Sequence, residues 1–140
     1  MKTFGYLIFL LLLAGCEKVS DRKLLVGNWQ LTSVLDKEDD RYYYYPDTLD
    51  SMVSMEITDS GLVWLSGYCN SGMAEFTYEN NHLRFYDAIL TEMYCNPVGM
   101  LWEDYLYQLV FVYEYQVSDN HLSLFTNSNY DLFFHKTEDP

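Results

Sequence analysis

Lysine and arginine are scarce in this chain. The 140 residues include 8 of them against 21 aspartates and glutamates, which gives a formal net charge of −13 at pH 7. An acidic surface of this kind repels the phosphates of nucleic acids and the headgroups of anionic lipids. The composition therefore argues against nucleic-acid binding as the function.

Long apolar runs are lacking too, with one exception near the N-terminus. Residues 4–13 form an apolar run after Lys2, and this run is too short to cross about 30 Å of hydrocarbon comfortably as a helix. Small residues and a cysteine, Leu13 to Cys16, end the run and resemble a bacterial lipobox. The resemblance implies a signal peptide over residues 1–15 and lipidation of Cys16. The alternative is an uncleaved membrane anchor with an incidental cysteine.

The lipobox resemblance also implies a location and a membrane partner. Several acyl chains on Cys16 give stable attachment, whereas one alone is marginal. We therefore expect a lipid-anchored protein of the bacterial cell envelope, with the outer membrane favoured. Residues 16–23 are expected to form a lipidated polar tether, and residues 24–136 a single domain. The mature chain keeps 7 basic and 21 acidic side chains, a net charge of −14.

Motifs that carry chemistry are absent from the sequence. There is no glycine-rich phosphate loop, and no nucleophile with a base and an orienting acid can be assembled. The three histidines, His82, His121 and His135, follow turns or end strands, so we expect them to be solvated. The acidic patch of residues 36–40 has no calcium-loop spacing and reads as a solvated loop. We expect no enzyme activity, no cofactor and no metal.

Cysteine is the next scarce residue, with only Cys69 and Cys95 left once Cys16 is lipidated. In an exported domain these two are either both free or bridged to each other, and we favour the bridge. A disulfide over this loop would stabilise the fold by about 3–4 kcal/mol in the chain-entropy model. The spacing is not that of a redox-active Cys-x-x-Cys pair.

Tyrosine, by contrast, is abundant, with 14 in an aromatic content of 18 %. Tyrosine and phenylalanine suit half-buried strands, so a β-rich domain is expected. Alternating patterns separated by turn residues predict seven or eight antiparallel strands. The predicted strands cover residues 24–35, 52–58, 62–68, 74–78, 83–86, 113–117, 122–125 and 130–135.

One helix is predicted, over residues 100–112. Trp102, Leu106, Leu109 and Tyr113 recur on one face, and the acidic residues that follow Trp102 fall in the expected first turn. Together the elements predict an α+β fold, with a small curved antiparallel sheet or incomplete β-barrel and one helix near the C-terminal third.

The order of these motifs resembles the META domain family, which includes the HslJ-like lipoproteins. Gly27 and Trp29 match the opening strand, and Tyr115 with Leu122 and Leu124 matches the closing hairpin. Between them, Cys69-Asn70 matches the family's Cys-Asn pair, Thr91, Met93 and Cys95 match its Thr-x-Met-x-Cys element, and Glu103 matches a helical glutamate. Tyr68 departs from the family glycine before the cysteine. The resemblance implies a small β-rich envelope domain and brings no catalytic residues.

Two functions remain open at this point. The first is a non-catalytic envelope lipoprotein that contacts a partner protein or supports envelope stress tolerance. Its candidate contact residues are the tyrosine run in the polar loop 36–51 and Asn70, although Asn70 is better explained by a bond to a local turn. The run consists of Tyr42, Tyr43, Tyr44 and Tyr45.

The second function is binding of a small apolar ligand in a calycin-like cup of strands. A filled interior would exclude it, and a pocket of a few hundred Å3 would favour it. The large side chains expected to fill a closed core are Trp29, Trp64, Phe76, Phe85 and Trp102.

Overall fold

The computed structural model describes residues 21–138. Cys16 and the predicted signal peptide of residues 1–15 lie outside the described residues, and their predictions stay predictions. In the described range the elements are α1 (Asp21–Leu25), β1 (Gly27–Asp36), β2 (Arg41–Tyr44), β3 (Ser54–Ile57), β4 (Leu62–Ser66), β5 (Ser71–Glu79), β6 (His82–Leu90), α2 (Pro97–Asp104), the 3₁₀ helix η1 (Tyr105–Phe111), β7 (Val112–Val117), β8 (His121–Thr126) and β9 (Tyr130–Thr137).

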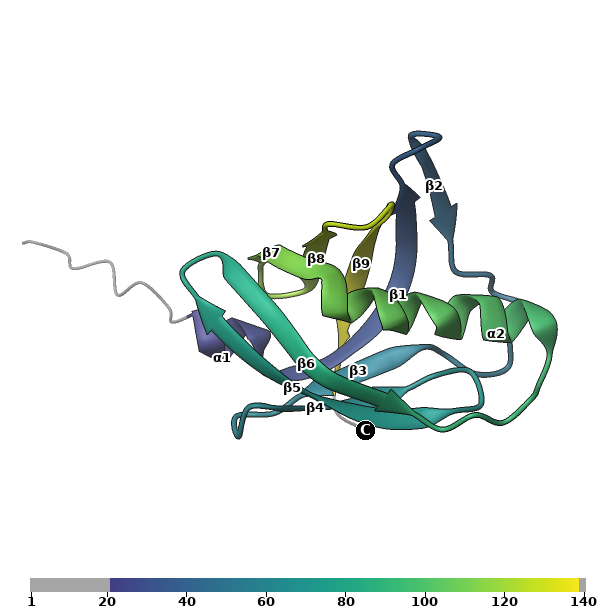
Figure 1. Ribbon diagram of the computed structural model, residues 1–140, viewed down its shortest axis with the longest axis horizontal. Helices are drawn as coiled ribbons and strands as arrows, with labels where there is room; N and C mark the ends of the chain where they lie inside the picture. The colour runs from purple at the N-terminus through teal and green to yellow at the C-terminus, as the bar shows by residue number, and fades with distance from the viewer. Residues whose placement is uncertain (1–20, 139–140) are drawn as a thin grey trace, which may run out of the picture.

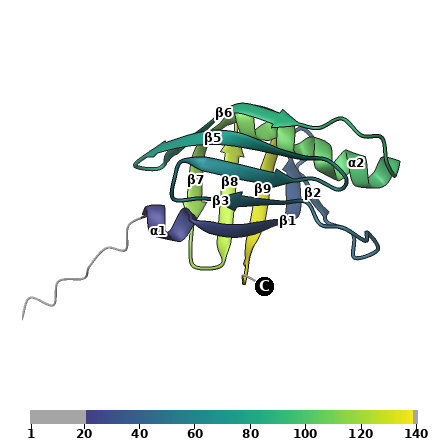
Figure 2. The same ribbon diagram turned by 90° about the horizontal axis from the view of Figure 1, so that it is seen from below.

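The strands form one antiparallel sheet that curls into a nearly closed barrel (Figures 1 and 2). Its order is β6-β5-β4-β3-β1-β9-β8-β7, and β2 pairs with the second half of β1 beside β3. The helical segment of α2 and η1 runs along the barrel between β6 and β7 in sequence (Figure 1). The α+β fold class predicted from the sequence is confirmed.

The barrel has one seam, where β6 and β7 meet. The backbone N–H of Tyr115 donates to the carbonyl of Asn81 over 3.0 Å, and the Tyr115 hydroxyl donates to the carbonyl of Asn80 over 2.9 Å. Asn81 also donates from its side chain to the Glu114 carboxylate over 3.0 Å. These bonds join the Asn80–Asn81 turn to β7. They close the seam at the hairpin end, although β6 and β7 are the two ends of the strand order and are not paired there as neighbours.

Apolar side chains fill the barrel. Trp29, Phe76, Phe85 and Trp102 are buried, as predicted. Trp64 is the exception, because it lies on the outer side of β4 and is 49 % exposed. Strand alternation explains the error: Val63 and Leu65 take the inward positions, which leaves the residue between them facing out.

The first helix corrects the prediction of a tether through residue 23. Helix α1 begins at Asp21, and Leu25 is fully buried against the barrel. Its carbonyl accepts a 2.7 Å bond from the Trp29 indole N–H, and the Leu24 carbonyl accepts one from Lys136 over 3.2 Å. Because the barrel supplies these donors, the segment is ordered where its polar sequence predicted a linker.

The predicted polar loop of residues 36–51 also contains structure. Residues 41–44 form β2, which pairs with β1 in an antiparallel register that places Tyr43 opposite Val34. A register irregularity in β1 between Leu31 and Ser33 shifts the alternation, so that Trp29 and Leu31 are followed inward by Val34, while Ser33 is opposite Phe133 and Tyr44. The strict alternation expected for β1 therefore fails at this point.

The helix starts and ends differently from the prediction. Asn96 caps it by accepting a 2.9 Å bond from the Val98 N–H, Pro97 occupies the first turn, and the α-helix changes to a 3₁₀ helix at Tyr105. Glu103 and Asp104 thus lie in the last turn of α2, and the prediction that they begin the helix is wrong. Within residues 21–138, no helix has the length and apolar character needed to cross a membrane.

Candidate functional site

Glu103 connects the helix to the turn before β5. Its side chain is buried, with 4 % of the residue exposed. One carboxylate oxygen, Oε2, accepts from the backbone N–H groups of Cys69 and Asn70, each over 2.9 Å. The other, Oε1, accepts from the Asn70 side-chain amide. A carboxylate held this way is a fixed structural anchor, since its oxygens are already occupied by the protein.

Asn70 bridges three segments. Besides its bond to Glu103, its amide nitrogen donates to the Met93 carbonyl over 3.0 Å. Its carbonyl oxygen accepts from the Thr91 hydroxyl over 2.9 Å and from the Met93 N–H over 2.6 Å. The Asn70 side chain does contact the local turn, through the Cys69 sulfur at 3.6 Å, but its other partners lie more than twenty residues away. Asn70 is buried, and its amide nitrogen and oxygen are both bonded within the protein.

The disulfide lies directly beside this network. Cys69 and Cys95 are bonded, with their Cα atoms 6.5 Å apart and a sequence separation of 26 residues. The predicted bridge is confirmed. It joins the turn before β5 to the loop before α2, the same two segments that Asn70 connects. Gly67 permits the close approach, because a Cβ at this position would overlap the Glu103 carboxylate.

The tyrosine run divides between two faces of β2. Tyr42 and Tyr44 point outward, and the Tyr42 ring lies 5.6 Å from the Phe133 ring. Tyr45 points to the helix, where its ring lies 5.0 Å from Trp102 and its hydroxyl donates to the Ser51 carbonyl over 2.7 Å. Only part of the run is therefore free for contact with another molecule.

An aromatic row continues from Tyr45 along the inner side of the helix. The Trp102 ring lies 5.5 Å from Tyr105, which lies 5.3 Å from Tyr130, both in edge-on geometry. Burial raises the pKa of the Tyr105 hydroxyl, and it raises the pKa of Tyr45 as well. These ring contacts pack the helical segment against Tyr45, which directly follows β2, and against Tyr130 of β9.

The outward side of α2 and η1 was not predicted as a surface, and it is apolar. We call it the helix face and define it by Val98, Leu101, Val110 and Phe111, each of which is exposed. Tyr94, in the loop before α2, is 84 % exposed beside its start. The sequence carried a signal for this face: residues 97–111 hold two charged side chains, and one of them, Glu103, is buried. A helix that is apolar on both sides is normally covered on both.

The charge around the helix face is mostly negative, and the exception is Arg84, which borders a hollow at the seam beside Val110 and Phe111. From residue 85 to residue 135 the sequence contains no lysine or arginine. Glu92 and Asp104 are exposed beside the face. Desolvation and the neighbouring Glu103 raise the pKa of Asp104, and the same acidic groups add to the effect of burial in raising the pKa of Tyr107. The face is an apolar surface within a negative field.

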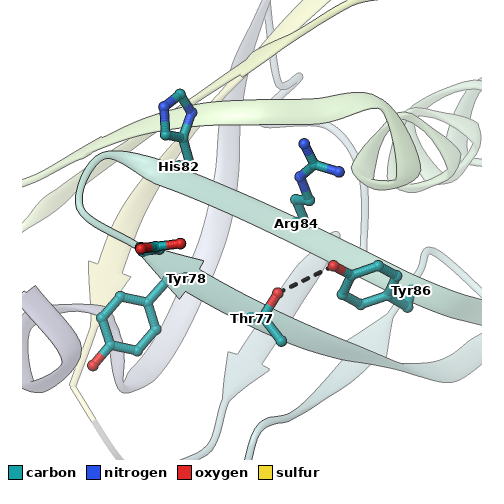
Figure 3. A pocket seen from close by; sticks show the side chains of 6 residues that line it. Thr77, Tyr78, His82, Arg84 and Tyr86 are labelled. Carbon is teal, nitrogen blue, oxygen red and sulfur yellow. Dashed lines mark hydrogen bonds between the residues drawn. The ribbon is translucent and has the colours of Figure 1, made fainter.

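The hollows of the molecule lie on its surface. One, of about 380 Å3, lies over the β5–β6 hairpin and is bordered by Tyr78, Arg84 and Tyr86 among others (Figure 3). Another, of about 290 Å3, lies at the seam beside Phe111 and Tyr113. The inward side chains of the barrel leave no such space among the hollows found in the described residues. The geometry therefore does not favour a ligand inside a cup of strands.

The histidines lie on the surface. His82 is exposed, and its Nδ1 lies 3.1 Å from the Tyr113 carbonyl. His121 and His135 face each other across β8 and β9 with ring centroids 5.2 Å apart. Over residues 21–138, no group of three or more His, Cys, Asp or Glu side chains could hold a metal ion.

With this geometry in place, the sequence can be compared with known proteins. The model of the META domain matches residues 22–139. The chain belongs to the META domain family. The match includes the disulfide, Asn70 and Glu103, so the network at the start of β5 lies inside the family domain. No curated protein matches the chain.

Solved structures share the fold of this META domain. A protein from Burkholderia xenovorans, solved by NMR, has a TM-score of 0.68 and 19 % identity, covering 84 % of this chain and 87 % of its own. A second NMR structure has a TM-score of 0.64 and 20 % identity, covering 85 % and 96 %. A DUF4847 family protein from Bacteroides vulgatus has a TM-score of 0.58 and 12 % identity, covering 84 % and 96 %. At these identities the likeness shows the fold alone.

Proposed function

We propose that this META domain protein is a non-catalytic, lipid-anchored protein of the bacterial cell envelope that binds a partner protein through the helix face. The observation that carries the proposal is the exposed apolar side of α2 and η1, where Leu101 is 57 % exposed and Phe111 is 49 % exposed. Full burial of one such side chain against a partner would contribute roughly 1.5–3 kcal/mol to the free energy of binding.

The partner we propose is a protein with an apolar patch and a basic rim. The absence of lysine and arginine between residues 85 and 135 favours a basic partner. A second copy of this chain is disfavoured, because the mature chain carries a net charge of −14 and two copies would repel each other. Anionic lipid is disfavoured for the same reason.

The position of the proposed anchor supports a protein as the occupant. Helix α1 lies at one end of the long axis, and the loop before α2 lies at the other end (Figures 1 and 2). However the segment between Cys16 and Asp21 is arranged, five residue steps span at most about 18 Å. A short link of this kind would hold the α1 end near the membrane and direct Tyr94 and the start of α2 away from it.

The anchor is tested with the variant Cys16→Ser. We expect the wild-type chain in the membrane fraction, with a mass that corresponds to an acylated Cys16 after removal of residues 1–15. The variant should remain folded and lose both the lipid mass and the membrane association. Retention of the variant in the membrane, with residues 1–15 uncleaved, would instead support a membrane-spanning leader.

The helix face is tested separately with Leu101→Asp in the anchored chain. Tyr44→Asp is the matched control, because Tyr44 is 73 % exposed on a different surface. We expect one co-purifying protein to be lost from Leu101→Asp and kept by Tyr44→Asp, and its binding to weaken as salt is added. Equal co-purification with both variants would contradict a role for the helix face.

A further inference from the structure

The outer side of β4, β5 and β6 forms a second surface, which adjoins the helix face at the seam, where Arg84 and Tyr86 border one hollow with Val110 and Phe111. The strand register places Trp64 opposite Met73 and Glu75 opposite Tyr86. Trp64 and Tyr86 are 49 % and 43 % exposed, so two aromatic rings stand on the outside of the sheet. Adjacent strands lie about 4.8 Å apart, and β4 and β6 flank β5, so the Cα atoms of these two residues are separated by roughly 10 Å or more.

Tyr86 is held in place on this surface. Its hydroxyl lies 3.2 Å from the Thr77 hydroxyl across the hairpin. Figure 3 shows Tyr86 leaning towards Thr77, with Arg84 and then His82 following along β6. A hydrogen-bonded ring on a paired strand loses little conformational freedom when a ligand stacks on it. The hollow of about 380 Å3 lies over these side chains.

Three charged side chains, one basic and two acidic, stand on this surface. Arg84 is a donor next to Tyr86, while Glu75 and Glu79 are acceptors on the facing strand. Within residues 21–138, no hydrogen bond or ion pair involves the side chain of any of these three residues. The register sets Arg84 opposite Thr77, with Glu75 and Glu79 diagonal to it on the facing strand. The surface thus offers Glu75 beside the two aromatic rings, and Arg84 and Glu79 in line beyond Tyr86.

The chemistry of these groups selects among ligand classes. An anionic ligand would meet Glu75 and Glu79, and a cationic ligand would meet Arg84. A purely apolar ligand would cover these charged groups without satisfying them, which costs free energy. A neutral polyhydroxyl molecule can both donate to the carboxylates and accept from the guanidinium, while its C–H faces stack on tyrosine and tryptophan.

We propose that the outer surface of β4–β6 binds a neutral glycan chain. Trp64 and Tyr86 stack on different sugar units. Glu75 bonds to hydroxyl groups near the two rings, and Arg84 and Glu79 bond to those of a unit that continues beyond Tyr86 towards the end of the hairpin. The separation of the two rings requires an oligosaccharide, since one sugar unit cannot contact both. This site does not depend on the proposed anchor or on the helix face.

The test uses the full chain in a detergent without a sugar headgroup. The probes are three neutral trisaccharides, namely chitotriose, cellotriose and maltotriose, with trigalacturonate as an anionic control. Because Trp29 and Trp102 are buried and Trp64 is exposed, quenching of tryptophan fluorescence by acrylamide reports on Trp64. We expect at least one neutral trisaccharide to protect Trp64 at millimolar concentration, and trigalacturonate to give no protection.

Variants show whether the binding uses the proposed residues. Calorimetry should show that Tyr86→Ala and Trp64→Ala each weaken binding about three- to tenfold, which is the range of an aromatic contact. Tyr94→Ala, at the start of the helix face, should leave it unchanged. Absence of protection by all three neutral sugars would overturn the proposal, and so would binding that persists in both variants. A protein cross-linked at Trp64, with no sugar protection, would assign this surface to a protein instead.

Discussion

At the scale of single residues, Glu103 has the largest structural consequence. Its carboxylate satisfies two backbone N–H groups and one amide, all donated from the turn that precedes β5. Hydrogen bonds to a charged acceptor contribute more than neutral ones, and a buried donor that loses its partner costs further free energy. Glu103 therefore acts through Cys69 and Asn70 as a positioning residue for the bridge region.

Glu103→Gln tests this role. The substituted side chain has one acceptor oxygen and places an amide N–H group against an existing donor, so the free energy of unfolding should fall by about 2–3 kcal/mol. The measurement is urea denaturation at neutral pH. Asp104→Asn is the matched control on the next residue, and it should change stability by less than about 0.5 kcal/mol. Equal effects of the two variants would contradict the anchoring role.

Tyr105 provides a prediction about pH. Burial raises the pKa of Tyr105 in the folded state above the ordinary tyrosine value of 10.0, so the unfolded chain releases this proton at lower pH than the folded chain does. Below the pKa of the unfolded state, Tyr105 is protonated in both states and does not change the free energy of unfolding with pH. As the pH rises through 10.0 towards the folded-state pKa, only the unfolded chain releases the proton, so the free energy of unfolding falls. Tyr105→Phe should leave stability at pH 7 nearly unchanged, because no hydrogen bond of the hydroxyl is described, and should reduce the alkaline loss.

Urea midpoints measured from neutral pH to above 10.0 check this prediction. Tyr45 and Tyr107 also have raised pKa values, so the variant should retain part of the pH dependence. An alkaline loss in Tyr105→Phe identical to that of the wild type would show that Tyr105 ionises equally in both states.

Sequence patterns identified some of the residues of the Glu103 network, but they did not identify the hydrogen-bond partners of those residues. The cysteines and Asn70 were found as candidates, but the bond from Asn70 to Glu103 joins residues 33 positions apart. No local periodicity encodes such a contact. Trp64 was misplaced because tryptophan is usually counted as a core residue, whereas the alternation of Val63 and Leu65 decides its side.

At the scale of elements, the strands were predictable where apolar and polar residues alternate, as in β5. Strand β2 was not predicted, because four consecutive tyrosines do not show the alternation of apolar and polar residues that indicates a strand. The helix start was placed too late because Pro97 and Gly99 look like breakers. Proline is tolerated in the first turn, and Gly99 is needed there because a Cβ would overlap the Tyr68 ring.

The disulfide connects two of these elements and gives a prediction at this scale. In a Cys16→Ser background, the double variant Cys69→Ser/Cys95→Ser should lower the free energy of unfolding by about 3–4 kcal/mol, because the bridge closes a loop with a separation of 26 residues. Urea denaturation of the two proteins measures the difference.

Thiol trapping gives an independent check of the same bridge. Under denaturing and non-reducing conditions, a thiol reagent should label neither Cys69 nor Cys95 in the Cys16→Ser protein. After reduction it should label both. Labelling of both cysteines without reduction, together with unchanged stability of the double variant, would refute a persistent bridge.

At the scale of the whole molecule, the central proposal is that the chain works by contact through the helix face while its α1 end stays near a membrane. The filled barrel core supports contact over ligand storage. The sequence indicated the α+β class and the family, but not this surface, because helical periodicity identifies the buried stripe and does not say that the opposite side is apolar as well.

The most direct test places a photo-cross-linking residue at Leu101 in the full chain and activates it in intact envelopes. The control position is Asp119, an exposed residue in the turn between β7 and β8. We predict one adduct of defined mass from position 101, none from position 119, and loss of the adduct when Phe111→Asp is added. No adduct at position 101 with normal protein levels, or equal adducts at both positions, would contradict the account.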